Sequence, residues 1–322
     1  MSELLLDIIF NCYANSICSI IGFLLSIVCF FTFNNSIFKL NYYNYFKMEI
    51  SLIGFDLFLT IFSICNYCPL LSLKSTYALV AYKFYGLWYF KSVLELSANL
   101  CCIFGTLNFY CIIAKKNLTW LKIISNISYI KVCSCLFIFS CAFFSYRLFE
   151  INIISVFDNK TNQSDHYVMS KTKFAESKIY GWLTLLTYSF RDLITTLILL
   201  ILNLLIFINV KKAISNKKYL QNRNLDSNEQ RNIKSTENSL KLMVFFGNFN
   251  NILGRLPLLI YFYNSYLIKF ESAWLLDISI LIIYLSYIIK FMLYFFTNKL
   301  FKKILQNYLN SVIIFLGLKN DM

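Results

Sequence analysis

Residues 287–309 read YIIKFMLYFFTNKLFKKILQNYL, an apolar run that passes directly into a basic segment. From Leu300 the apolar residues recur at helical spacing, at Leu300, Phe301, Ile304, Leu305, Tyr308 and Leu309. The opposite helix face carries Lys299, Lys302, Lys303, Gln306, Asn307 and Asn310. A helix of this kind lies on a membrane surface, with its apolar stripe in the lipid boundary and its lysines near anionic headgroups. The segment therefore predicts a membrane span followed by a short amphipathic surface helix.

The whole chain is too apolar for a soluble globular protein, since 58% of its 322 residues are hydrophobic and only 14% are charged. The apolar residues form separate runs, each near the ~20 residues that cross a bilayer as a helix. We count seven, at Ala14–Phe33, Ile50–Leu71, Val80–Ala114, Ile127–Phe149, Tyr180–Val210, Leu240–Tyr263 and Trp274–Thr297. The runs are apolar on all faces, which favours helices over the alternating strands of a β-barrel. We therefore predict an all-α membrane protein, a seven-helix domain over residues 1–310 and a short cytoplasmic tail over 311–322.

The net charge of +14 is explained mainly by membrane topology. If the N-terminus is outside, most lysines and arginines of the connecting segments lie inside, above all in the basic segment Lys211–Ser239. This predicts a multi-pass plasma-membrane protein with an extracellular N-terminus, and nucleic-acid binding has no part in it. The polar loop Glu150–Ile179 is then outside and contains two acceptor sequons, at Asn159 and Asn162, as candidate glycosylation sites.

Enzymatic and metal-binding functions find little support in the residue types. Cys65-x-x-Cys68 has no second pair, and the single histidine, His166, lies in a loop. One histidine also leaves little for acid–base catalysis, and the chain has no glycine-rich nucleotide loop. We expect no enzyme, no metal and no cofactor.

Several spans carry motifs that belong together. The last span contains LYFFTNKLFKK with Tyr294 and Phe301, and the sixth contains LGRLPLLIYFY with Pro257. The second contains MEISLIGFDLFLTIF with Asp56, and the third ends in LNFYCIIAKKNL with Phe109 and Tyr110. On these motifs the chain resembles the rhodopsin-like family of G-protein-coupled receptors, in a form similar to invertebrate peptide receptors. The resemblance implies a buried aspartate at Asp56, a kink at Pro257, an activation tyrosine at Tyr294, and the surface-helix aromatic at Phe301.

The departures from the family pattern fall at positions that the family uses for signalling. Phe109, followed by Tyr110, stands where the family has the arginine of its Asp-Arg-Tyr motif. Lys290 replaces a residue of the closing motif, and Arg255 replaces the tryptophan below the ligand pocket. A receptor-like protein that does not couple is therefore an alternative, and so is a transporter or ion-conducting protein. The absence of internal repeats and of paired broken helices argues against the transporter.

Charged residues inside the spans need partners, because an isolated charge in a bilayer is costly. The resemblance implies that Glu95 and Arg255 meet across spans three and six, and we expect an ion pair there that Arg191 or Asp192 extends. It also implies that Asp56 lies beside Lys290. We expect those two residues to pair, so that the lysine ammonium takes the place of the sodium ion bound by other family members.

The candidate ligand-binding residues are Lys91, Glu95, Arg191, Arg255 and Tyr284. By the resemblance, Lys91 stands where amine receptors have an aspartate, so a biogenic amine would be repelled. Lys91 and Glu95 are four residues apart on one helix face, and the alternative for Lys91 is a side chain that snorkels outward. The position of the retinal lysine of opsins corresponds to Tyr284, which argues against retinal. The sequence thus predicts a receptor for an extracellular peptide, such as a neuropeptide, or a small acidic molecule, with the lipid bilayer and a heterotrimeric G protein as partners.

Overall fold

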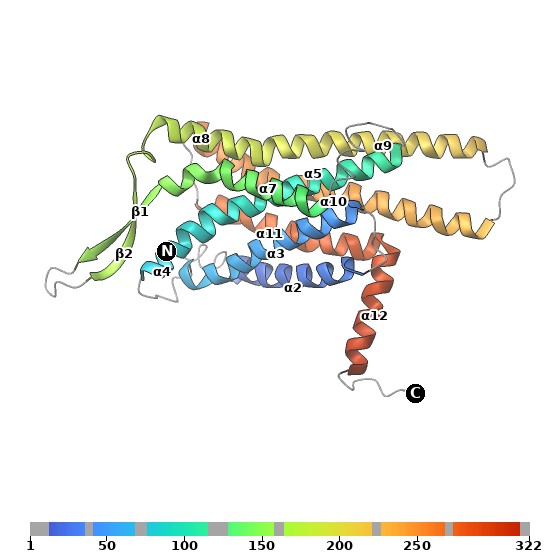
Figure 1. The fold of residues 1–322 in the computed structure, drawn as a ribbon, viewed down its shortest axis with the longest axis horizontal. Coiled ribbons are helices and arrows are strands. Elements are labelled where there is room, and N and C mark those ends of the chain that lie inside the picture. The colour runs from blue at the N-terminus through green and yellow to red at the C-terminus, as the bar shows by residue number, and fades with distance from the viewer. Residues whose placement is uncertain are drawn as a thin grey trace.

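The computed structural model describes residues 13–35, 41–67, 76–114, 128–157, 164–220, 227–267 and 273–315. Within these ranges long helices run alongside one another, a β-hairpin projects from one end, and a last helix leaves steeply at the other (Figure 1). The helices before the hairpin are α2 (Asn15–Phe33), α3 (Asn41–Tyr67), α4 (Tyr77–Ala81), η2 (Tyr82–Phe90), α5 (Lys91–Ala114), α7 (Tyr129–Phe144) and η3 (Ser145–Phe149). Those after it are α8 (Lys178–Tyr188), η4 (Ser189–Ile194), α9 (Thr195–Leu220), α10 (Ser227–Leu267), α11 (Ala273–Thr297) and α12 (Lys299–Phe315).

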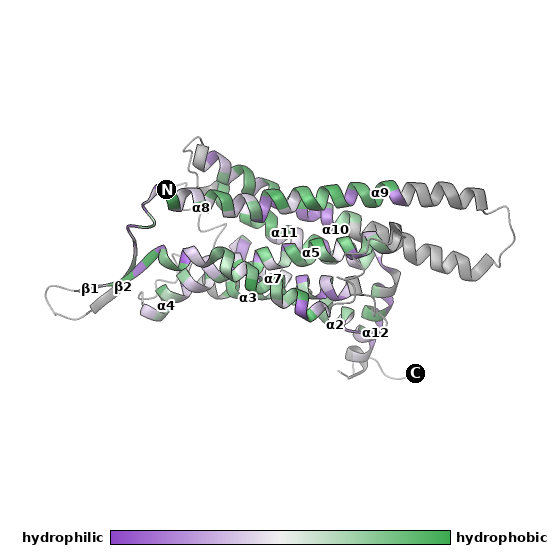
Figure 2. Ribbon diagram, turned by 45° about the horizontal axis from the view of Figure 1, so that its top comes forward, coloured by the Kyte–Doolittle hydropathy of each residue, from purple (hydrophilic) through white to green (hydrophobic). Residues whose placement is uncertain are grey.

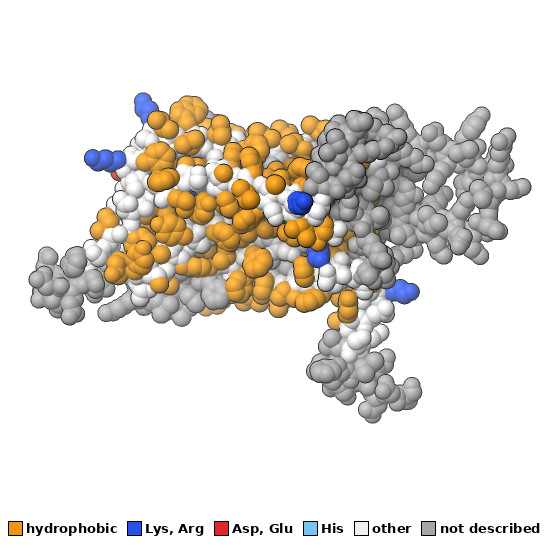
Figure 3. All heavy atoms as spheres, in the orientation of Figure 1, with side chains coloured by type: hydrophobic (Ala, Val, Ile, Leu, Met, Phe, Trp, Pro, Cys, Tyr) orange, Lys and Arg blue, Asp and Glu red, His pale blue; other side chains and the backbone are white. Residues whose placement is uncertain are grey.

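Five helical stretches among the described residues are long and apolar enough to cross a membrane. They are Asn15–Phe33, Tyr77–Cys111, Tyr129–Phe149, Lys178–Asn209 and Leu275–Thr297. The other two predicted runs form the helices α3 and α10 but do not meet this criterion. On the face seen in Figure 3 apolar side chains are spread over the bundle, and α8 and the first part of α9 are strongly hydrophobic in Figure 2. These features indicate a helical, membrane-embedded protein.

Helices α10 and α11 approach each other closely at Gly254. A Cβ atom at this position would lie 2.5 Å from the Ser286 hydroxyl oxygen, so the contact depends on the missing side chain. Pro257 follows within the continuous helix α10. Since proline has no N–H, the carbonyl of Leu253 loses its helical hydrogen bond, and α10 has a place to bend.

The segment after η3 differs from the polar loop that we predicted. Strand β1 (Ile151–Phe157) pairs antiparallel with β2 (Ser164–Lys171), and the register shifts between Val156 and Phe157. Side chains of β1 lie alternately on its two faces, so that Ile151 is buried and Asn152 is exposed. The all-α description therefore needs this one addition. The candidate glycosylation sites Asn159 and Asn162 lie outside the described residues.

Helix α12 has the amphipathic character that its sequence predicts. Phe301, Ile304 and Leu305 are buried against the bundle, and Lys302 and Lys303 are exposed. The helix begins where the Asn298 side chain accepts a hydrogen bond from the Phe301 N–H, at 3.1 Å. It continues to Phe315, so the first five residues of the predicted tail over 311–322 are helical.

Candidate functional site

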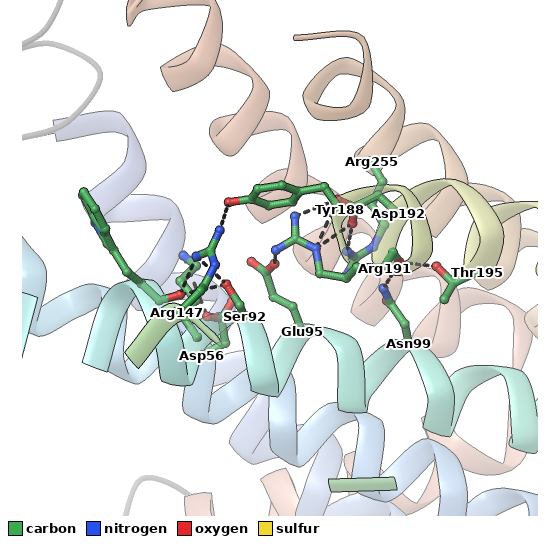
Figure 4. Close-up of polar contacts among 12 residues, drawn as sticks. Asp56, Ser92, Glu95, Asn99, Arg147, Tyr188, Arg191, Asp192, Thr195 and Arg255 are labelled. Atoms are coloured by element: carbon green, nitrogen blue, oxygen red, sulfur yellow. Dashed lines mark hydrogen bonds and ion pairs between the residues drawn. The ribbon is translucent and has the colours of Figure 1, made fainter. Parts of the chain in front are cut away.

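A chain of four buried charges connects three elements of the bundle. Glu95 belongs to α5, Arg191 and Asp192 to η4, and Arg255 to α10 (Figure 4). Arg191 Nη1 lies 2.6 Å from Glu95 Oε2, and Arg191 Nη2 lies 2.6 Å from Asp192 Oδ2. Asp192 Oδ1 lies 3.1 Å from Arg255 Nη1. Two carboxylates and two guanidinium groups alternate along the chain, which makes it electrically balanced and able to remain buried.

The local fold of η4 explains how adjacent residues both enter this network. Residues Ser189–Ile194 form a π-helical turn, wider than an α-helical one. Arg191 and Asp192, adjacent in this turn, are both buried. The Arg191 carbonyl accepts hydrogen bonds from the Asn99 amide, at 3.0 Å, and from the Thr195 hydroxyl. The turn thus holds the network in place through backbone as well as side-chain contacts.

The predicted direct pair between Glu95 and Arg255 is wrong. Arg255 instead contacts Asp192, and Glu95 contacts Arg191, so the two residues are joined through η4. Arg191 and Asp192, which we expected only to extend a direct pair, are the residues that link Glu95 to Arg255. Arg255 Nε has no hydrogen-bond partner, which leaves one donor of the network unsatisfied.

Lys91 and Tyr284, the other two predicted ligand-binding residues, meet beside Asp56. Lys91 Nζ donates hydrogen bonds to the Tyr284 hydroxyl at 2.6 Å and to the Thr60 hydroxyl at 3.1 Å. It lies 3.8 Å from Asp56 Oδ1, and neither oxygen of Asp56 has a hydrogen-bond partner. The Lys91 side chain is thus directed into the bundle, where Asp56 offsets its charge. It does not extend outward toward the membrane surface, which was the alternative prediction.

The predicted pair of Asp56 with Lys290 is also wrong. Lys290 Nζ contacts Glu49 Oε1, and both side chains are buried. Glu49 precedes Asp56 by two helical turns on the same face of α3, so Lys290 meets α3 about 10 Å from the predicted place. Glu49 was missed because it directly precedes the predicted apolar run, which begins at Ile50.

Four of the seven predicted activation and structural residues gather at the α12 end of the bundle. Phe109, Tyr110, Tyr294 and Phe301 belong to one buried apolar cluster. Phe33 of α2 contacts two of them, with ring centroids 5.4 Å from Tyr294 and 5.1 Å from Phe301. This cluster joins α2, α5, α11 and α12.

Asn248 and Arg147 are further buried polar residues that the prediction did not include. Asn248 of α10 donates to Thr106 of α5 and to Asn203 of α9, both at 2.9 Å. Arg147, at the hairpin end of the fourth predicted span, is the other. The available signal was the residue type, because an asparagine or arginine within an apolar run needs a partner.

No family model matches the chain, and no curated protein sequence is significantly similar to it. The features that bear on function are the charge network and the apolar cluster, at the two ends of the bundle. The charge network lies toward the hairpin end and the apolar cluster toward the α12 end, and the same helices carry both.

Proposed function

We propose that this protein is a seven-helix membrane receptor of the rhodopsin-like class of G-protein-coupled receptors. Its seven spans would be α2, α3, α4 through α5, α7 with η3, α8 through α9, α10, and α11. The N-terminus and hairpin would be extracellular, and α12 would lie on the cytoplasmic face of the plasma membrane. The distribution of positive charge supports this orientation.

The observation that carries the proposal is the pair of linked regions at opposite ends of the same helices. Helix α5 contributes Glu95 to the charge network and Phe109 to the apolar cluster. Helix α11 contributes Tyr284 near Lys91 and Tyr294 to the apolar cluster. A shift of α5 or α11 at the charge network would therefore also displace side chains of the apolar cluster. Such a connection between two ends is what a signalling receptor requires.

The ligand that we favour is a peptide, with a heterotrimeric G protein as the intracellular partner. A peptide that entered between Lys91, Glu95 and Arg255 would reposition α10 relative to α5. Signalling then requires the peptide to bind the arrangement with α10 displaced more tightly than the resting one. Pro257 and the contact at Gly254 would set where α10 bends and where it stays against α11.

The test is nucleotide exchange on purified heterotrimeric G proteins by the chain in lipid nanodiscs, in the presence of a peptide library. We expect at least one peptide to accelerate exchange in proportion to receptor concentration. Ligand-independent ion or solute flux in liposomes, without exchange, would overturn the proposal in favour of a transporter or channel.

Phe109 favours a second candidate, a receptor-like protein that binds its ligand without coupling. Its side chain is 4% exposed and belongs to the apolar cluster, where the family has an arginine. A Phe109→Arg variant separates the two candidates. If this variant stimulates exchange with a peptide that binds the native chain without effect, the non-coupling candidate is correct.

A further inference from the structure

Arg147 of η3 is a buried cation without an acidic partner. Its side chain is directed into the bundle, and the residue is 6% exposed. Nη1 donates to the Trp88 carbonyl at 2.9 Å and to the Ser92 hydroxyl at 3.3 Å, and Nη2 donates to the Tyr188 hydroxyl. Nε has no hydrogen-bond partner. All three partners are neutral oxygens, so none of them balances the charge of the guanidinium group.

No carboxylate of the described residues lies within the 4.0 Å ion-pair distance of Arg147. Glu150, only three residues along the chain, does not pair with it, and Glu150 Oε2 is itself buried without a hydrogen bond. An unbalanced buried charge is costly, whereas the neighbouring network balances each of its charges. Among the described residues, Arg147 is therefore a buried cation at which an added negative charge would be favourable.

The Nε and Nη2 edge of Arg147 has a donor without an acceptor. Nε and Nη2 form one edge of a guanidinium group, and a carboxylate binds there through two parallel hydrogen bonds. Arg191 shows this arrangement in the same bundle, because its Nε and Nη2 donate to Asp192 at 3.0 Å and 2.6 Å. On Arg147, Tyr188 takes one hydrogen of Nη2 and nothing takes Nε.

Tyr188 connects this arginine to the charge network and to α10. Figure 4 shows it extending between Arg147 and Arg191, and its ring lies 4.8 Å from the Arg191 guanidinium carbon. The same ring stacks on Phe262 of α10, with centroids 4.1 Å apart. A small cavity is lined by Tyr188, Asp192 and Phe262, among others, and Arg147 is not part of its lining. Movement of Tyr188 away from Arg147 would therefore be transmitted directly to α10.

We propose that Arg147 binds a carboxylate of the receptor's peptide ligand, through Nε and Nη2, and that this carboxylate displaces the Tyr188 hydroxyl. This inference rests on the proposed function and moves the acid-recognising role from Lys91, whose charge Asp56 already offsets, to Arg147. The neutral, largely aromatic surroundings suit a single planar anion. The carboxylate is either the C-terminus of the peptide or one of its acidic side chains.

Three dipeptides that differ in one group distinguish these sources. They are N-acetyl-Asn-Phe with a free C-terminus, N-acetyl-Asp-Phe-amide, and the neutral N-acetyl-Asn-Phe-amide. Each is titrated into the purified full chain in nanodiscs, and the shift in Tm reports binding without any G protein. We expect at least one acid to stabilise the chain more than the neutral peptide does, and the effective acid identifies the source. Equal shifts for all three peptides would overturn the proposal.

Variants assign the binding to Arg147. Arg147→Gln should weaken the effective acid about tenfold or more, since it removes hydrogen bonds to a charged group. Lys178→Gln, which removes an exposed positive charge at the start of α8, should leave binding unchanged. If the acid preference survives in Arg147→Gln, or disappears equally in Lys178→Gln, the assignment is wrong.

A second pair of variants decides the matter if Arg147→Gln does not fold. Ser92→Asp places a carboxylate where the serine hydroxyl already contacts Nη1, and so supplies the missing charge internally. It should raise the Tm of the free chain and abolish the acid preference, whereas Ser92→Asn should retain that preference. Acid binding that persists in Ser92→Asp would refute the role of Arg147. Because binding and nucleotide exchange are measured separately, failure of acid recognition leaves the receptor proposal to its own test.

Discussion

Neutralising Asp192 should destabilise the protein more than neutralising Glu95, although both carboxylates belong to the same network. Asp192 contacts Arg191 and Arg255, whereas Glu95 contacts Arg191 alone. Asp192→Asn leaves Arg255 without its carboxylate partner, while Arg191 keeps Glu95. Glu95→Gln leaves Arg191 paired with Asp192 on its Nε and Nη2 edge.

The magnitudes follow from what each substitution leaves unpaired. Removing one partner of a buried ion pair costs about 3–5 kcal/mol. Losing one hydrogen bond to a charged group costs about 1.5–3 kcal/mol. At about 2 °C per kcal/mol for a chain of this size, Asp192→Asn should lower the Tm by about 6–10 °C and Glu95→Gln by about 3–6 °C.

A thiol-reactive fluorogenic dye can measure the Tm in detergent or nanodiscs, because Cys29, Cys101, Cys102 and Cys133 are free and buried until the bundle unfolds. Glu176→Gln, at an exposed position before α8, is the control for loss of a negative charge. Restoring the charge balance with Asp192→Asn plus Arg255→Gln should recover part of the lost Tm. If Asp192→Asn melts no lower than Glu95→Gln, the number of ion pairs that a carboxylate makes does not govern the stability of this network.

Three further predictions concern the packing of the bundle. Gly254→Ala should lower the free energy of unfolding by about 1–3 kcal/mol, because it forces α10 away from a serine of α11. Gly247→Ala, whose Cβ would meet nothing within 4 Å, should leave stability unchanged. Equal Tm values for the two variants would contradict the close approach. We expect the Tm to fall in Lys290→Gln and in Glu49→Gln, and the double variant to regain most of that loss. Additive losses in this double-mutant cycle would show that the two residues do not interact. Phe301→Ala should cost about 3–5 kcal/mol locally and speed amide hydrogen exchange in α12; unchanged exchange would mean that this side chain does not hold α12 to the bundle.

The helices and their order could be predicted from the sequence, because the length and apolarity of each run suffice to form a helix in a membrane. The amphipathic α12 followed from spacing alone. The ion pairs did not follow. The partner of a buried lysine depends on the depth and rotation of two helices, and two turns of α3 separate Glu49 from Asp56. Linear sequence carries no direct measure of that depth.

Two local features were missed for a different reason. The strand Ile151–Phe157 was missed because adjacent Ile153 and Ile154 interrupt a period-two pattern, and because the surrounding segment has the polar composition of a loop. Arg147 was missed because it stands near the end of an apolar run, where an arginine is ordinarily expected to reach the membrane surface. In the folded protein it is directed into the bundle instead.

The π-helical turn η4 also determines the phase of the helix that follows it. Leu199, Leu202, Asn203 and Ile206 of α9 are buried, a spacing typical of one helix face. The buried residues of α8 are Thr184 and Thr187. In a continuous α-helix their face and the buried face of α9 would differ in direction by about the rotation of one residue, and the wide turn η4 between them takes up this difference. Deleting a single residue of η4 would convert the segment to continuous α-helix and rotate α9 by about 100°. The length of this turn, more than its composition, therefore decides which side of α9 meets the lipid.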